Sequence, residues 1–260
     1  EFATDSRLLA DHMATVTYVN SVVATSTTKL ATERSMVEDT PILDFIGKVE
    51  TDTVAKAIKG GTCDGIPVIA QVSPFSRTAT FPEGDVKIKD IAGLYVFDNT
   101  LAGILLTGTQ LKDYLEYSAK YFKQVEDGAT VNAAPASEGG DTQADYQGKP
   151  VWDYNYDAVT GIRYSIDISQ PVGKRILGLS WQGRPIDGDQ DFVLAINSYR
   201  MSGGGDYPHV TEAPVVWDES LEIRQLLIDT ATAMKTIDPK DFFDRNWFLT
   251  TSGETWPTGG

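Results

Sequence analysis

Residues 192–207 read Phe-Val-Leu-Ala-Ile-Asn-Ser-Tyr-Arg-Met-Ser-Gly-Gly-Gly-Asp-Tyr, and this stretch places an aromatic ring soon after an apolar run. The run over residues 192–196 is short and continuous, which predicts a buried strand. Tyr199 then offers a flat face for stacking, and the three glycines let the backbone approach a ligand closely. Asp206 can accept hydrogen bonds from a sugar diol. The alternative is a surface turn with a tyrosine at the edge of the core, because glycine-rich turns commonly follow strands.

Composition indicates a folded, acidic protein. The chain has 260 residues, of which 41% are hydrophobic, and a formal net charge of −15 at pH 7. This charge argues against duplex nucleic acid as a partner, because phosphate binding requires clustered Lys and Arg. No apolar run approaches the roughly 20 residues of a transmembrane helix. Cys63 is the only cysteine, and the sequence begins Glu1-Phe2-Ala3 without Met or a signal peptide, so we expect a segment of a longer protein.

The two histidines, His12 and His209, are too few for most zinc or dinuclear metal sites. The sequence also lacks His-Glu-x-x-His, Gly-x-Ser-x-Gly, a Walker loop and a Gly-x-Gly-x-x-Gly motif after a strand. His12 lies in an amphipathic stretch and is expected to be a packed or surface residue. His209 is expected to belong to loop structure rather than to act as a general base. We therefore expect no metal site and no catalytic residue in this chain, which does not resemble a complete enzyme.

Hydrophobic periodicity predicts helices and strands in a mixed order. Helices are expected over residues 5–19, 40–58 and 110–122 and from Ser220 onward, and strands over residues 19–30, 67–72, 84–90, 103–107, 161–167, 175–181 and 192–197. The last three strands are expected to pair with one another. This order does not repeat strand–helix units, which favours an α/β or α+β fold of layered, mixed sheets flanked by helices. Residues 126–150 are polar and too long for an ordinary connection, which predicts a mobile insertion.

Six segments share their order and spacing with one known family. They read Asp39-Thr-Pro-Ile-Leu-Asp-Phe45, Ser73-Pro-Phe75, Leu94-Tyr-Val-Phe-Asp-Asn-Thr-Leu101, Thr107-Gly108 with Leu115-Glu-Tyr-Ser-Ala119, Tyr154-Asn-Tyr-Asp157 and Asn197-Ser-Tyr-Arg200. Together they resemble the C-terminal domain of the 5′-nucleotidase family. They are most similar to the branch that includes 2′,3′-cyclic-nucleotide 2′-phosphodiesterase/3′-nucleotidase. The resemblance extends over nearly the whole chain.

The resemblance implies a hydrolase of nucleotide catabolism that is secreted, periplasmic or attached to the cell surface. In this family an N-terminal metallophosphatase domain holds two divalent metal ions, and domain rotation carries the substrate to them. The C-terminal domain binds the nucleoside part of the substrate. Because this sequence has none of the metal-binding motifs, the resemblance implies a single nucleotide-binding domain over residues 1–260. Residues 1–18 would form an interdomain helix, and this chain alone would hydrolyse nothing.

The resemblance implies an aromatic clamp. By position, Phe97 and Tyr199 correspond to two rings that sandwich the base, and Asn99 lies beside the stack, where it can hydrogen-bond the base edge. Stacking of a base on an aromatic ring contributes about 1–3 kcal/mol and tolerates different bases. The alternative for Phe97 is a core position, because Tyr95 and Phe97 share the parity of a strand.

The resemblance also implies residues for the sugar and the phosphate. Asp206, with the backbone of Gly204, corresponds to the carboxylate that binds ribose hydroxyls, although it stands one residue further from the ring than in the classical pattern. Arg77 and Arg34 resemble arginines that meet the phosphate or ribose. The classical branch has Asn-Gly-Gly-Gly-Ile-Arg where residues 72–77 here read Val-Ser-Pro-Phe-Ser-Arg, so the backbone around the phosphate differs.

Two other functions fit the same residues. A non-catalytic cell-surface module for sugars or proteins would also combine acidic charge, exposed aromatic rings and a glycine-rich loop. A self-contained hydrolase could work with carboxylates alone, but the sequence shows no recognisable paired-carboxylate motif. Nucleotide recognition is the function that the ordered set of segments favours.

Overall fold

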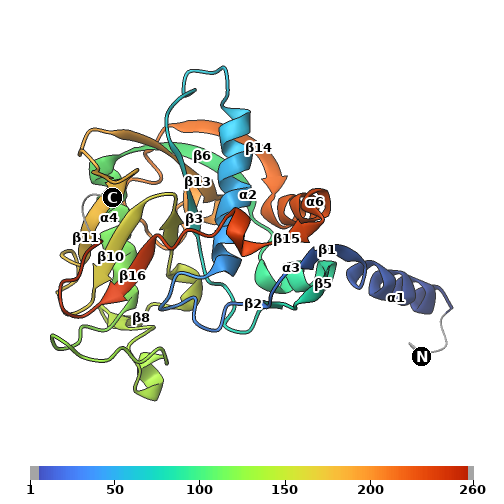
Figure 1. Ribbon diagram of the computed structural model, residues 1–260, viewed down its shortest axis with the longest axis horizontal. Helices are drawn as coiled ribbons and strands as arrows, with labels where there is room; N and C mark the ends of the chain where they lie inside the picture. The colour runs from blue at the N-terminus through green and yellow to red at the C-terminus, as the bar shows by residue number, and fades with distance from the viewer. Residues whose placement is uncertain (1–5, 257–260) are drawn as a thin grey trace.

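The computed structural model describes residues 6–256 as layered sheets with flanking helices (Figure 1). The helices are α1 (Ser6–Val19), α2 (Pro41–Ala57), α3 (Ile88–Leu94), α4 (Gly108–Ser118), α5 (Ser198–Met201) and α6 (Ile223–Met234), with 3-10 turns η2 (Ala119–Tyr121), η3 (Ala136–Glu138), η4 (Asp153–Asn155) and η5 (Pro239–Asp241). The strands are β1 (Val22–Ser26), β2 (Leu30–Ala31), β3 (Val68–Val72), β4 (Thr80–Phe81), β5 (Gly84–Lys87), β6 (Thr100–Thr107), β7 (Asp145–Tyr146), β8 (Lys149–Pro150), β9 (Ala158–Thr160), β10 (Arg163–Asp167), β11 (Ile176–Trp181), β12 (Arg184–Pro185), β13 (Asp191–Asn197), β14 (Val215–Glu222), β15 (Thr236–Ile237) and β16 (Trp247–Thr250).

A five-stranded mixed sheet in the order β14-β6-β13-β3-β9 forms the centre of the molecule. Its middle strand, β13, runs antiparallel to β6 and parallel to β3. Every residue of β13 after Asp191 is buried, which explains its continuous apolar sequence. Helix α2 lies across this sheet in Figure 1 and packs against β3, β9 and β13. Helix α4 packs against β6, β9 and β11.

Two further sheets complete the layered α/β arrangement that the sequence predicts. One has the order β12-β11-β10-β16, and the other has the order β15-β1-β5. Two strand pairs, β2-β4 and β7-β8, lie outside them. Parallel and antiparallel pairs occur within the same sheets, so the mixed character of the fold is confirmed.

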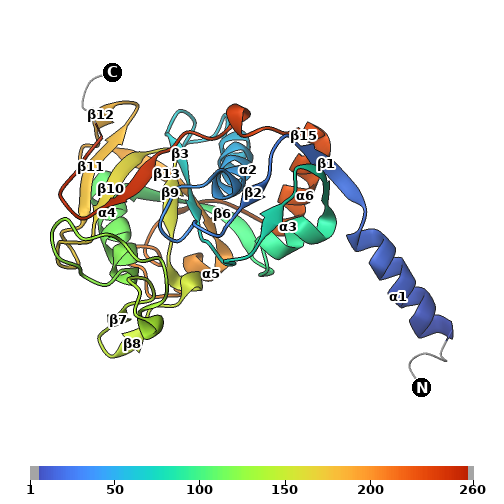
Figure 2. The same cartoon turned by 60° about the horizontal axis from the view of Figure 1, so that its bottom comes forward.

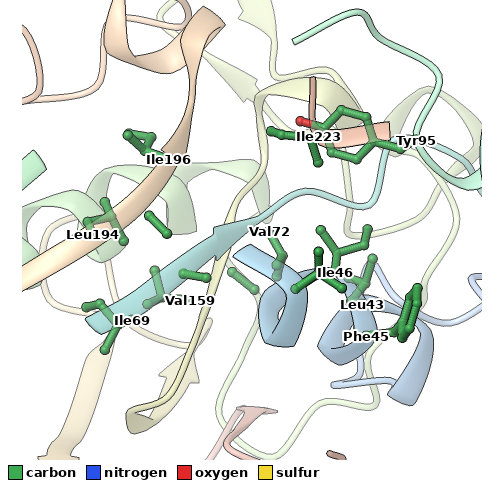
Figure 3. Packing of buried hydrophobic residues seen from close by; sticks show 14 of the residues in the cluster. Leu43, Phe45, Ile46, Ile69, Val72, Tyr95, Val159, Leu194, Ile196 and Ile223 are labelled. Atoms are coloured by element: carbon green, nitrogen blue, oxygen red, sulfur yellow. The ribbon is translucent and has the colours of Figure 1, made fainter. Parts of the chain in front are cut away.

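The core joins α2 to the central sheet. Figure 3 shows Leu43 and Ile46 of α2 near Val72 of β3, and each of these side chains is at most 2% exposed. Full burial of such a side chain stabilises the fold by about 1.5–3 kcal/mol. The helix begins at Pro41, whose fixed φ suits the first helical position. Local sequence and packing therefore favour the same helix.

Four expectations about individual elements are wrong. The strand expected over residues 19–30 is instead two short strands, β1 and β2, which lie in different sheets. The strand expected over residues 84–90 ends at Lys87, because Asp90 accepts a hydrogen bond from the Lys87 N–H (2.8 Å) and starts α3. The last helix begins at Ile223, since Ser220 has a φ of 55° and lies in β14. Strand β13 does not pair with β10, which instead lies between β11 and β16. Pairing of strands depends on the whole chain path, which local periodicity does not encode.

Helix α1 projects from the body in both views (Figure 2). It leaves large apolar side chains in solvent, with Leu9, Met13 and Tyr18 at least 50% exposed. Residues 1–5 of the interdomain helix expected over residues 1–18 lie outside the described residues. No described helix is both long enough and apolar enough to cross a bilayer.

The polar segment over residues 126–150 contains η3, β7 and β8. Backbone hydrogen bonds join residues 141–144 of this segment to residues 121–123, from Lys123 N to Asp141 O (2.8 Å) and from Ala144 N to Tyr121 O (2.9 Å). The segment therefore lies against the end of α4 and η2, and it forms part of the wall of a cavity discussed below.

Candidate functional site

Five side chains from separate parts of the chain line a small apolar pocket. They are Phe75, Phe97, Asn99, Tyr154 and Tyr199, and the pocket has a volume of about 180 Å³. This is below the roughly 300–1,000 Å³ of drug-sized ligand sites, so it suits one planar ring system rather than a whole ligand. Four aromatic walls and one amide are a surface on which a flat, partly polar ring can stack and be read at its edge.

Tyr199 is presented by the turn that follows β13. The side chain of Asn197 accepts a hydrogen bond from Arg200 N (2.9 Å) and caps α5. Ser198 Oγ accepts one from Thr100 N (3.1 Å), which fastens α5 to β6. Tyr199 is 42% exposed. Local capping therefore fixes the backbone under a ring that remains open to solvent.

Gly204 lies directly against the Tyr199 ring. A Cβ atom added at Gly204 would come within 2.5 Å of ring carbons, a distance that real contacts do not show. Gly204 N also donates to Tyr199 O (2.8 Å). The requirement for glycine here is steric rather than conformational, since the neighbouring Gly203 and Gly205, not Gly204, carry the positive φ values.

Phe97 and Asn99 lie on the loop between α3 and β6, which Arg224 of α6 holds in place. Arg224 donates to Tyr95 O (2.9 Å) and Val96 O (3.1 Å) and pairs with Asp98 (2.7 Å). Phe97 is 41% exposed.

The spacing of Tyr95 and Phe97 in the sequence fits two positions on one face of a strand, but in the structure the two residues do not share a strand. Tyr95 follows the end of α3 and is 2% exposed, whereas about two-fifths of Phe97 is exposed to solvent. Phe75 makes edge contacts with both rings, with centroid distances of 5.1 and 4.9 Å. Tyr95 is therefore the residue that lies in the core, and Phe97 lines the pocket.

Tyr154 and Phe75 are pocket residues that sequence reasoning did not single out. Both lie in segments that carry the family resemblance, which was the available signal. The carbonyl of Tyr154 accepts a hydrogen bond from Arg200 Nη2 (2.6 Å), and Arg200 Nη1 donates to Gly204 O (3.2 Å). One buried guanidinium therefore joins the two loops that present Tyr154 and Tyr199.

Arg200 is neutralised by Asp157, and both side chains are completely buried. Arg200 Nε and Nη2 donate to the two Asp157 oxygens at 2.7 and 2.9 Å. Ser73 and Tyr114 donate to the same carboxylate at 2.5 Å each. Burial, and next the charge of Asp157, raise the pKa of Tyr114 well above its ordinary value, so its hydroxyl remains a donor. This network is the rigid base under the pocket.

The other predicted site residues lie outside the residues that line this pocket. Arg77 donates to both oxygens of Asp153 (2.7 and 2.8 Å) and also to Tyr121. Burial raises the pKa of Asp153, but hydrogen bonds from Arg77 and its neighbours outweigh this effect and leave the pKa below its ordinary value. Arg34 is exposed and paired with Glu38.

Asp206 ends the glycine-rich turn. It is exposed, with a left-handed φ of 57°, a conformation that Asp adopts more readily than most residues. Nε2 of nearby His209 lies 2.9 Å from Oδ2 of Asp113, a residue that does not line the aromatic pocket. His12 is exposed on α1. Within residues 6–256 no group of three His, Cys, Asp or Glu side chains is placed to hold a metal ion.

A larger cavity of about 490 Å³ lies between α2 and the turn before β10. Both cations among its described lining residues are already paired, Lys48 with Asp52 (2.7 Å) and Arg163 with Asp244 (3.1 Å). Phe242 is the one aromatic side chain among its described lining residues. The aromatic pocket therefore remains the candidate for ring recognition.

Comparison with known proteins gives the same assignment as the ordered segments. The sequence model described as 5′-nucleotidase, C-terminal domain, matches residues 22–212. The chain is 31% identical over 258 residues to the trifunctional nucleotide phosphoesterase protein YfkN of Bacillus subtilis, covering 92% of this chain and 17% of that protein. It is 26% identical over 260 residues to the 2′,3′-cyclic-nucleotide 2′-phosphodiesterase/3′-nucleotidase of Haemophilus influenzae, covering 91% of this chain and 38% of that protein.

The fold has a counterpart among solved structures. The 5′-nucleotidase precursor of Thermus thermophilus superposes with a TM-score of 0.71 at 17% identity, covering 96% of this chain and 44% of that chain. The chain thus spans less than half the length of these relatives, and in family terms it corresponds to their C-terminal part. The family model covers most of the chain, and the chain belongs to the family of 5′-nucleotidase C-terminal domains.

Proposed function

We propose that this chain is the substrate-recognition domain of a nucleotidase or cyclic-nucleotide phosphodiesterase and binds a nucleoside base between Phe97 and Tyr199. The observation that carries the proposal is the convergence of Phe97, Asn99 and Tyr199 on one pocket. Both rings are about two-fifths exposed, so each has a face available to a ligand. Asn99 supplies an amide for the base edge. Among the described residues, the side chain of Asn99 makes only a long hydrogen bond, from its Nδ2 to the hydroxyl of Tyr95 (3.5 Å), so its polar atoms remain available.

The sugar and phosphate are proposed to lie along the glycine-rich turn. Asp206 is exposed next to Gly205 and would accept hydrogen bonds from the ribose hydroxyls, with the backbone of Gly204 beside it. Arg77 and Arg34 would add positive potential for the phosphate. Because the Arg77 guanidinium already binds Asp153, its effect on a phosphate would be through space.

Hydrolysis is proposed to take place in an N-terminal metallophosphatase domain of the parent protein, with two divalent metal ions that activate water. No group of the described residues is placed to hold such ions, so this chain would contribute binding and orientation only. We further propose that α1 joins the two domains, since its exposed apolar side chains need a covering surface. The parent would act in the periplasm, at the cell surface or outside the cell.

The clamp is tested by calorimetric titration of the chain with adenosine and with its 2′-, 3′- and 5′-phosphates. We expect Tyr199→Ala and Phe97→Ala each to weaken adenosine binding about ten-fold or more, because loss of one stack removes about 1–3 kcal/mol. Tyr18→Ala, which removes an exposed ring on α1, is the matched control and should bind normally. Equal affinity for adenosine in the wild type and both pocket variants would contradict the proposed aromatic clamp. Glycan binding that survives both substitutions would favour a surface binding module instead.

Gly204→Ala should weaken adenosine binding as strongly as Tyr199→Ala while changing stability little. The new methyl group would occupy the space of the Tyr199 ring, and this exposed ring can swing away at small cost. Gly93→Ala is the control, because a Cβ there meets no atom within 4 Å. Titration and urea denaturation of both variants measure the two effects. Unchanged affinity in folded Gly204→Ala would show that the ring position does not matter for binding.

A further inference from the structure

A third cavity, of about 410 Å³, lies between η2 and the polar segment over residues 126–150. It shares no lining residue with the aromatic pocket. Its volume falls within the range of small-molecule sites. Its lining combines three cations, one carboxylate and several apolar side chains, among them Lys120, Lys123, Arg175, Asp145, Phe122 and Tyr146. An excess of positive charge is unusual in a protein whose net charge is −15.

Lys120 is a buried cation without an ion-pair partner among the described residues. It is 9% exposed, and its Nζ lies 3.3 Å from the centre of the Tyr117 ring and 5.3 Å from that of Tyr146. Neither the ion pairs nor the hydrogen bonds of residues 6–256 include its ammonium group. Cation–π contacts offset only part of the cost of burying a charge. The three N–H donors of this group are therefore left for a ligand.

Arg175 is the second buried cation of this cavity, and it is 1% exposed. Its Nε donates to Gln170 O (2.8 Å), and its Nη1 donates to Ala119 O (2.8 Å) and Phe122 O (2.7 Å) at the end of η2. Within the described part of the chain, the side-chain hydrogen bonds of Arg175 involve Nε and Nη1 and not Nη2. Nη1 of the guanidinium thus caps the end of η2, and Nη2 remains available to a ligand.

Burial, rather than the neighbouring charges, disfavours the charged form of Lys120. Burial lowers the pKa of Lys120 to about 8, while the carboxylate of Asp206 raises it and the guanidinium of Arg200 lowers it. Burial likewise lowers the pKa of Arg175, to about 10, although Glu116 and Asp167 act in the opposite direction. An anion bound between these groups would offset the burial of both charges.

We propose that this cavity binds a small organic anion, whose carboxylate or phosphate group contacts Lys120 Nζ and Arg175 Nη2 and whose apolar part lies against Phe122 and Tyr146. The site is distinct from the nucleoside pocket of the proposed function and does not depend on it. A lysine that merely packs on tyrosine rings would not confer anion binding, so the two roles are separable by experiment.

The test uses benzoate for the carboxylate class and phenyl phosphate for the phosphate class. Both are titrated at pH 7 into the Tyr199→Ala variant, because loss of this ring weakens binding of the probes in the aromatic pocket. The affinities of the two probes show which class of anion the cavity prefers. We expect saturable binding of at least one probe and a loss of about ten-fold or more in affinity in Lys120→Met, which keeps the length and apolar stem of the side chain. Lys112→Met, an exposed lysine of α4, is the matched control and should bind normally.

Chemical-shift titration of isotope-labelled lysine side chains in the chain with native Lys120 provides a second readout that does not require the variant to fold. We expect the Lys120 signal to shift with either probe and the Lys112 signal to stay in place. Absence of saturable binding by both probes overturns the proposal. Binding that leaves the Lys120 signal unmoved, or that survives intact in folded Lys120→Met, also overturns it.

Discussion

Asp157→Asn is expected to lower the free energy of unfolding by about 3–5 kcal/mol, the range typical of breaking a buried ion pair by removing one partner. The substitution keeps the side-chain shape but leaves Arg200 charged and completely buried. It also places amide donors against Ser73 and Tyr114, which donate to this carboxylate at 2.5 Å. Urea denaturation followed by circular dichroism measures the loss.

A double-mutant cycle separates the ion pair from general damage to the core. Because Asp157→Asn/Arg200→Met removes the unpaired charge, we expect the double variant to lose less stability than the sum of the single variants. Asp52→Asn is the control, since its exposed pair with Lys48 contributes at most about 0.5 kcal/mol. Additive losses, or a loss below about 1 kcal/mol in Asp157→Asn, would contradict the stabilising role of the Asp157–Arg200 ion pair.

Asp44→Asn is expected to stabilise the protein by several kcal/mol at pH 9 and by much less at pH 4. Asp44 is 5% exposed, and its Oδ1 has no hydrogen-bond partner among the described residues. Burial, and next the negative charge of Asp39, raise the pKa of Asp44 from 3.8 to about 8. Each unit of pKa corresponds to about 1.4 kcal/mol.

The direction of the pH dependence of stability follows from the number of protons bound by the folded and unfolded states. The folded pKa of Asp44 lies above the unfolded value, so between pH 4 and 8 the folded state binds more protons and stability falls as pH rises. Above pH 8 the wild type carries the full cost of a buried charge, which asparagine does not. Urea denaturation at pH 4, 7 and 9 measures the difference, with the exposed Asp85→Asn as control. A stability difference between Asp44→Asn and wild type that does not change with pH would rule out the raised pKa.

The aromatic clamp shows how far sequence alone reaches. Phe97 and Tyr199 could be singled out because they stand in recognisable segments, and the structure brings both to one pocket with Asn99. Tyr154 also stands in one of these segments, but the segment alone does not place it in the pocket, because its position depends on a hydrogen bond that Arg200, a residue far along the chain, donates to its carbonyl. Arg77 was expected to meet a phosphate, but its position relative to Asp153 is set by the path of the chain between them.

By itself the sequence determined the elements whose signals are local: α2 with its leading proline, α4 with the capping box of Thr107 and Gln110, and β13 with its continuous apolar run. It also determined the family, through short segments in a fixed order. Only the tertiary structure decided the neighbours of β13, the exposure of Phe97 beside buried Tyr95, and the burial of Lys120 and Arg175 without an ion pair among the described residues. The physical reason is that capping and periodicity act within a few residues, whereas strand pairing, burial and charge neutralisation depend on groups that only the folded chain brings together.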